Sequence, residues 1–211
     1  MRKNTGERLA RDITQRDAKT RASIARQEAS RKGLHALGCV WAVWGYFWPV
    51  LVVLGLTFFS VVYIIHEMLR LRGRGLGLVE QLGNLTRRQK ERRAPALGPV
   101  ALAAGIILCF LVFDARLASA AVLAACGCDC AAGVVGILWG RHSLPFIPRK
   151  TLEGTLAGLG VAFVACVPIV GVLRGLVAAA VAAIVEALPL EDMDNIVVPV
   201  AAACALALLS M

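Results

Sequence analysis

Asp129 is the residue whose type and position most directly suggest chemistry, because it lies within a run of apolar and small residues. An ionisable side chain inside a membrane segment is costly and usually functional. Gly127 and Gly133 beside it could allow a break in the helix or a water-filled vestibule that would make the carboxylate accessible. The alternative is a structural hydrogen bond or ion pair between helices.

A second acidic group, Asp192 and Asp194 followed by Asn195, lies in a short turn between two apolar runs. If it faces the same side as Asp129, the carboxylates suit Mg²⁺, which proteins bind through one or two carboxylates and substrate phosphates. The sequence therefore predicts metal ligands among Asp129, Asp192 and Asp194, although a solvated turn remains an alternative for the last two.

Basic residues that could neutralise phosphate follow Asp129 in a proline-broken loop. This loop ends in Lys150 and Thr151, and Glu153 and Gly154 open the next apolar run. Backbone N–H groups and positive charge in such a loop can hold phosphates. Lys150, with its neighbours Arg141 and Arg149, is the candidate phosphate ligand, and the alternative for Lys150 alone is an anchor at the membrane boundary.

Arg31, Lys32 and His35 form another basic group where the first apolar run begins. Helical spacing places Arg31 and His35 on one face, four residues apart. They could bind a phosphate or an acidic partner, and boundary anchoring is the alternative. Cys126, Cys128 and Cys130 lack the partners for a tetrahedral metal site and are expected to be reduced, buried packing residues.

The elements that must position these residues are apolar helices. The chain has 211 residues, of which 58% are hydrophobic, more than a soluble domain usually has. Because a span needs about 20 residues and Pro49 divides the first long run, the pattern predicts an all-α, polytopic integral membrane bundle of about seven spans. Residues 1–32 form a basic leader, and 33–211 form the membrane domain that carries the candidate catalytic residues. The predicted spans are 33–48, 49–69, 95–113, 115–140, 153–172, 174–190 and 196–211.

The basic residues predict the orientation. With this span count, all Lys and Arg residues except Arg116 and Arg174 lie on one side, which the positive-inside rule makes the cytoplasm. The N-terminus is therefore predicted to be cytoplasmic. The net charge of +9 reflects this topology, and no aromatic-interleaved basic surface of the kind that binds nucleic acid is present.

Four local patterns stand out together in this sequence. They are Arg31-Lys32-x-x-His35, Arg88-x-x-Glu91, the central stretch from Asp129 to Lys150-Thr151-x-Glu153-Gly154, and Asp192-x-Asp194-Asn195 with Pro199 after it. With these patterns the sequence resembles the family of CTP-dependent lipid kinases that contains dolichol kinase, phytol kinase and the yeast-type diacylglycerol kinase. It departs from the family pattern in having Cys128 directly before the central acid and Met193 between the two later acids, so either Asp192 or Asp194 could match the family acid.

The resemblance implies phosphoryl transfer from CTP to the hydroxyl of a membrane lipid, with a divalent cation and a site that faces the cytoplasm. Asp129 and one of the later acids would hold Mg²⁺ or orient the acceptor hydroxyl, and Asp129 is the first candidate for general base. Lys150 would contact the nucleotide phosphates. The implied nucleotide-binding residues are Arg31, Lys32, His35, Arg141, Arg149, Lys150, Thr151, Glu153, Gly154 and Asn195.

Two other functions remain open. A phosphatidate cytidylyltransferase also uses CTP in membranes, but the sequence lacks that family's terminal Asp-Arg-x-Asp pattern. A small transporter or assembly protein would turn over no nucleotide, and the sequence shows no internal repeat that favours a transporter. The lipid alcohol could be diacylglycerol, a polyprenol or phytol, and the sequence leaves the oligomeric state open.

Overall fold

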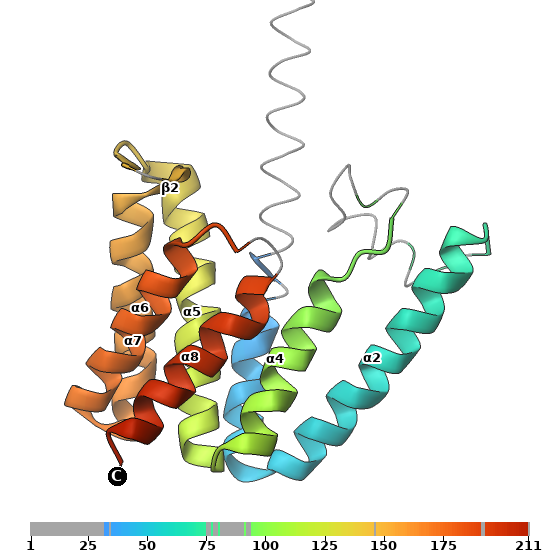
Figure 1. Ribbon diagram of the computed structural model, residues 1–211, viewed down its shortest axis with the longest axis horizontal. Coiled ribbons are helices and arrows are strands. Elements are labelled where there is room, and N and C mark those ends of the chain that lie inside the picture. Colours follow the sequence, from blue (N-terminus) through green and yellow to red (C-terminus); the bar gives the residue numbers. More distant parts are fainter. Residues whose placement is uncertain are drawn as a thin grey trace, which may run out of the picture.

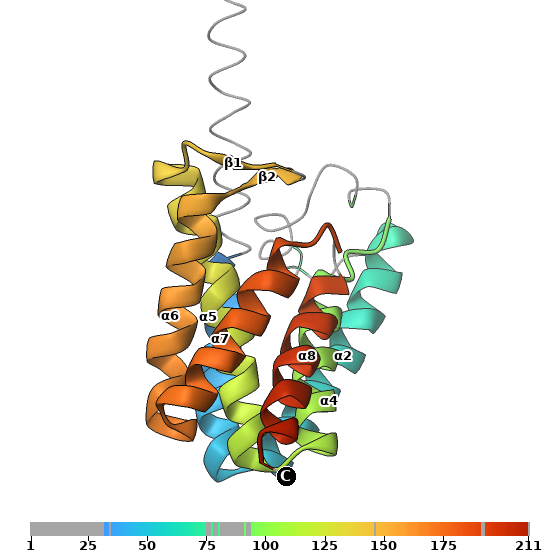
Figure 2. The ribbon, with the colours of Figure 1, turned by 60° about the vertical axis from the view of Figure 1, so that its left-hand side comes forward.

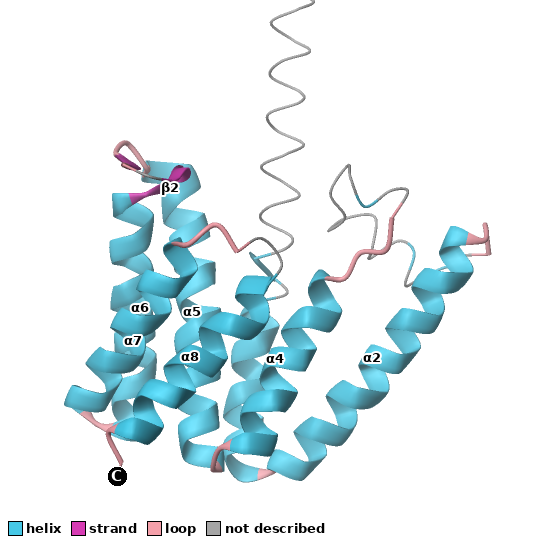
Figure 3. Cartoon of the chain, in the orientation of Figure 1, coloured by secondary structure: helices cyan, strands magenta, loops and turns pink. Residues whose placement is uncertain are grey.

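The protein is a bundle of helices with one short β-hairpin at one end (Figures 1 and 3). The structure is a computed structural model that describes residues 32–33, 35–74, 77, 80, 91, 94–145, 147–190 and 193–210, without the side chains of 148 and 149. Within these residues the helices lie where the apolar runs predicted them, so the all-α fold class is confirmed.

The first described helix covers residues 35–47, and residue 48 separates it from the second. The other helices are α2 (Pro49–Leu71), α4 (Gly98–Val112), α5 (Ala115–Trp139), α6 (Leu152–Val170), α7 (Val172–Ala187) and α8 (Asp194–Leu208). The hairpin pairs β1 (Ser143–Leu144) with β2 (Ile147–Thr151) in antiparallel register, where the sequence had predicted only a loop.

Local chemistry explains where several helices begin and end. Pro49 begins α2, in the first turn, where its missing N–H has no intrahelical partner in any case. The side chain of Asp114 caps α5 by accepting hydrogen bonds from two backbone N–H groups, and Thr151 caps α6 by accepting one from the N–H of Gly154 at 3.2 Å. Gly171, with φ of +84°, makes the turn between α6 and α7.

Three of the described helices, α2, α5 and α6, are long and apolar enough to cross a membrane. Helices α4 and α8 are apolar but shorter. The structure therefore fits an integral membrane protein, while the number of seven spans and the side on which the N-terminus lies stay predictions.

Helix α5 is the centre of the bundle, and α4, α6, α7 and α8 all contact it (Figures 1 and 2). Every residue from Leu117 to Asp129 on this helix is buried. The helix is continuous past Gly127 and Gly133, so of the two arrangements that these glycines could allow, a break in the helix is not the one observed. Asp129 instead lines a small cavity near the ends of neighbouring helices.

The predicted site segments meet at one end of the bundle. The hairpin, the C-terminal end of α7 and the N-terminal ends of α4 and α8 all lie at this end (Figures 1 and 2). The turns at Gly171 and between α4 and α5 lie at the opposite end. This alternation is what successive antiparallel spans require.

Candidate functional site

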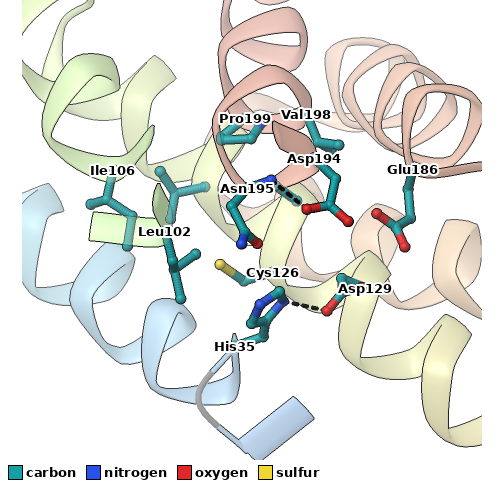
Figure 4. A pocket seen from close by; sticks show the side chains of 12 residues that line it. His35, Leu102, Ile106, Cys126, Asp129, Glu186, Asp194, Asn195, Val198 and Pro199 are labelled. Atoms are coloured by element: carbon teal, nitrogen blue, oxygen red, sulfur yellow. Dashed lines mark hydrogen bonds and ion pairs between the residues drawn. The ribbon is translucent and has the colours of Figure 1, made fainter. Parts of the chain in front are cut away.

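A small cavity near the hairpin end brings together polar side chains from four helices. His35 comes from the first described helix, Asp129 from α5, Glu186 from α7, and Asp194 and Asn195 from α8 (Figure 4). The cavity has a volume of about 20 Å³, which is room for about one water molecule. Any ligand larger than a water molecule would therefore bind at the rim or need the helix ends to move apart.

Asp129 is 5% exposed, and both of its carboxylate oxygens are ion-paired. The Nζ of Lys32 donates to Oδ1, and the Nδ1 of His35 pairs with Oδ2. A buried carboxylate is tolerated when it is paired in this way, and removal of one partner of a buried pair costs about 3–5 kcal/mol. The structure thus brings together Lys32, His35 and Asp129, three of the predicted site residues.

Two small residues of α5 give Lys32 its place beside Asp129. Gly133 lies one turn after Asp129, and a methyl group there would overlap Cε of Lys32 and lie 2.9 Å from its Nζ. The thiol of Cys130 donates to the backbone carbonyl of Lys32 at 3.0 Å. Gly133 therefore serves the site as space for the lysine side chain.

Lys150, on β2, forms an ion pair with Glu186, near the C-terminal end of α7. Glu186 is 4% exposed and also accepts a hydrogen bond from Lys150 Nζ through its backbone carbonyl, at 2.8 Å. Glu186 was not among the predicted site residues, although it is an acid inside an alanine-rich apolar run. The same signal that indicated Asp129 could have indicated it.

Asp194 and Asn195 begin α8 and face the cavity, as the sequence predicted (Figure 4). The Oδ1 of Asp194 accepts a hydrogen bond from the backbone N–H of Asn195 at 2.8 Å, and the Asn195 side chain donates to the carbonyl of Gly98 at 3.4 Å. Gly105 of α4 allows the backbone of Asn195 to lie close to α4, because a methyl group at Gly105 would overlap the carbonyl oxygen of Asn195. Asn195 thus fixes the start of α8 against α4.

The residues around the start of α6 organise the hairpin and do not line the cavity. Thr151 caps the helix, and the carboxylate of Glu153 accepts from the backbone N–H of His142 at 3.3 Å and contacts its Nδ1 at 2.6 Å. A methyl group at Gly154 would lie 2.6 Å from the carbonyl oxygen of Ala132, so this glycine permits close packing of α6 on α5. These contacts explain the presence of Thr151, Glu153 and Gly154 by their structural roles at the start of α6.

The remaining predicted residues stand apart from the cavity or outside the described residues. Arg141 is exposed before the hairpin. Arg31 and Asp192 lie outside the described residues, as does the side chain of Arg149, and so does Arg88 of the weaker resemblance pattern. The structure therefore leaves open which of Asp192 and Asp194 matches the family acid.

The carboxylates at the cavity fit only the kind of Mg²⁺ site in which the protein contributes one or two ligands. Within the described part of the chain, no three His, Cys, Asp or Glu side chains form a group that could hold a metal ion. Asp129 and Asp194 nevertheless line one cavity, and Mg²⁺ commonly uses one or two carboxylates with substrate phosphates. All seven cysteines are free thiols; Cys126 and Cys128 are buried as predicted, whereas the prediction that Cys130 is buried is wrong, because it is half-buried.

Comparisons of this chain with protein-family models, with curated proteins and with solved structures each found no match. The functional assignment therefore depends on the residues of this chain and on the geometry of the cavity.

Proposed function

We propose that this protein is a CTP-dependent lipid kinase that transfers the γ-phosphoryl group to the hydroxyl of a membrane lipid alcohol of the diacylglycerol or polyprenol and phytol type. The observation that carries the proposal is one cavity at the end of an apolar helical bundle. There, three carboxylates and His35 line the cavity, and Lys32 and Lys150 contact two of these carboxylates. Such a set can bind phosphates, a hard cation and a hydroxyl group together.

The basic residues support the phosphate-binding part of the proposal. Lys32, His35 and Lys150 are held at the cavity by Asp129 and Glu186. Phosphoryl transfer needs little covalent chemistry from the protein, and it depends on positioning and on neutralising charge. We infer that, when a nucleotide binds, its phosphates replace some of the carboxylates as partners of these basic side chains.

The transfer itself balances without a further reactant. The lipid hydroxyl oxygen bonds to the γ-phosphorus of CTP, the bond from that phosphorus to the β–γ bridging oxygen breaks, and CDP leaves. The hydroxyl proton passes to a carboxylate, for which Asp129 is the first candidate, and then to water. Since Lys32 and His35 occupy both Asp129 oxygens, both must move before one oxygen can accept the proton and the other can hold the cation.

Asp129 and Asp194 would hold the divalent cation together with the nucleotide phosphates. When bound, Mg²⁺ supplies positive charge that stabilises the phosphoryl group and the leaving CDP. The side chains of this chain would orient the nucleotide and the acceptor around it.

An apolar groove supports a lipid as the acceptor. It lies between α2 and α4 and has a volume of about 430 Å³. Val61 and Ile64 line it from α2, and Ile107 lines it from α4. It reaches Ile196, the residue after Asn195, so a hydrocarbon chain in the groove would have its polar end near the start of α8.

The proposed site faces the cytoplasm, where CTP is available. The support is the asymmetry of Lys and Arg in the sequence, from which the positive-inside rule predicts that the hairpin end is cytoplasmic. This orientation also gives the lipid hydroxyl access from the membrane surface.

The test uses two labels of the same nucleotide. Purified protein in detergent is given CTP labelled at the γ- or the α-phosphate, with diacylglycerol, a polyprenol, phytol or phosphatidate, and with or without Mg²⁺. A kinase transfers the γ-label to a lipid alcohol and needs the cation. Transfer of the α-label to phosphatidate, with release of pyrophosphate, would instead establish a cytidylyltransferase, and transfer of neither label would refute both activities.

A further inference from the structure

We propose that Glu186 is the residue that positions Lys150 for the nucleotide phosphates, an inference that rests on the proposed function. Glu186 contacts Lys150 twice, through its side-chain Oε1 and through its backbone oxygen. Its carboxylate also faces the cavity beside Asp129 and Asp194 (Figure 4). The lysine that the sequence analysis assigned to phosphate binding is therefore fixed by a carboxylate of the same site.

The end of α7 explains why this residue can hold a lysine so firmly. Helix α7 ends at Ala187, so the carbonyl of Glu186 is one of the last four, which lack an intrahelical partner. The C-terminal end of a helix also carries partial negative charge, which attracts a cation. The Lys150 ammonium group thus makes three favourable interactions at one place. It donates to a helix carbonyl that has no intrahelical partner, it lies at the negative end of the helix dipole, and it pairs with a buried carboxylate.

The geometry leaves Lys150 able to serve a second partner. A lysine ammonium group has three N–H donors, and the two hydrogen bonds described for Lys150 both go to Glu186. The Lys150 side chain is 31% exposed, whereas that of Glu186 is 6% exposed. The third N–H can therefore meet a phosphate at the rim while Glu186 keeps the ammonium group in place.

The base of the hairpin also has contacts that do not involve Lys150 or Glu186. The backbone N–H of Leu152 donates to the carbonyl of His142 at 2.8 Å, and Glu153 binds the same histidine. The Lys150–Glu186 pair differs from these contacts because the carboxylate of Glu186 lines the cavity. This place favours a role in binding.

The test measures nucleotide binding and turnover separately. The full chain in detergent is titrated with β,γ-methylene-CTP and Mg²⁺, and the initial rate is measured against CTP and against the lipid alcohol. We expect E186Q to raise both the Kd of the analogue and the KM for CTP about tenfold or more, as loss of a supporting partner does at other sites. We expect the KM for the lipid to stay within twofold and E186D to restore part of the nucleotide affinity.

A double-mutant cycle separates positioning from general damage. If Glu186 acts through Lys150, E186Q has no further effect on the analogue's Kd in a K150A background. Equal and independent effects of E186Q in both backgrounds would overturn the inference. So would unchanged analogue binding with lost turnover, because Glu186 would then act on the reacting groups directly.

Two measurements keep the inference apart from the proposed function. Thermal unfolding shows whether E186Q is folded, and E186D takes its place in the cycle if it is not. If the wild-type protein transfers label to no lipid, the kinase proposal fails, while analogue binding still decides whether Glu186 acts through Lys150. Wild-type protein that fails to bind the analogue overturns both.

Discussion

Two lysines from different parts of the chain, Lys32 and Lys150, each contact a buried carboxylate at the cavity. This paired arrangement keeps acids and bases close together inside an apolar bundle, where an unpaired charge would be costly. Under the proposed function, nucleotide phosphates and a cation would exchange with the members of each pair, and phosphoryl transfer would depend on small displacements of single side chains.

Gly133 gives a test of this dependence at the residue scale. In G133A the new methyl group overlaps Cε of Lys32, so the lysine side chain must shift from its present position beside Asp129. We expect the initial rate of phosphoryl transfer to fall about 10- to 100-fold, since small misplacements of reacting groups have effects of this size.

The matched control is G127A on the same helix. A methyl group there would lie 3.4 Å from Cγ1 of Val161, which is an ordinary contact. Its rate should stay within about twofold of wild type, because nothing in the site has to move. Equal rates for G133A and wild type would show that the position of Lys32 is unimportant for transfer.

At the scale of elements, the packing of α6 on α5 holds the site together. G154A places a methyl group 2.6 Å from the carbonyl oxygen of Ala132 and 3.2 Å from Cα of Gly136, both of them backbone atoms. We expect a loss of about 1–3 kcal/mol, seen as a melting temperature in detergent about 2–10 °C lower. The control G160A meets no atom within 4 Å and should not lower it.

The groove between α2 and α4 gives a second prediction about elements. Ala104 lines the groove from α4, so A104F would fill part of it with a phenyl ring. We expect the KM for the lipid alcohol to rise about tenfold while the KM for CTP is unchanged, because the chain of the acceptor loses its room. V112F, on an exposed position of the same helix, should change neither. A parallel rise in both KM values for A104F would contradict a groove specific for the lipid.

The sequence predicted the helices well because their boundaries have local causes. Pro49, Asp114 and Gly171 each explain a boundary through their own backbone or side-chain chemistry. The hairpin was missed because strands of two and five residues that contain Pro148, Arg149 and Lys150 show no alternation of apolar and polar residues. Short strands of this kind depend on contacts made after folding.

The site was predicted in part for a similar reason. Asp129, Lys150 and Asp194 were found because charged residues near apolar runs are conspicuous in a sequence. The pairs Lys32–Asp129 and Lys150–Glu186 join residues far apart in the chain, so only the packed helices define them. The role of Gly133 as space for a lysine is likewise a tertiary property.

At the scale of the whole molecule, the orientation in the membrane can be tested with single cysteines. Ser143 in the hairpin and Val172 at the opposite end are both exposed. In a background where Cys204, which is exposed, is replaced by serine, we expect an impermeant maleimide to label S143C from the cytoplasmic face of sealed vesicles and V172C from the other face. Labelling of both from one face would refute the predicted topology.

The most direct test of the central claim compares two acids on one helix, Asp129 in the site and Asp114 at the other end of α5. Asparagine caps a helix as well as aspartate does, so D114N keeps the cap and removes a carboxylate. The measurement is the initial rate of γ-label transfer from CTP to the lipid alcohol for wild type, D129N and D114N. The account predicts a loss of about 100-fold or more for D129N and a wild-type rate for D114N. Wild-type transfer by folded D129N would contradict it.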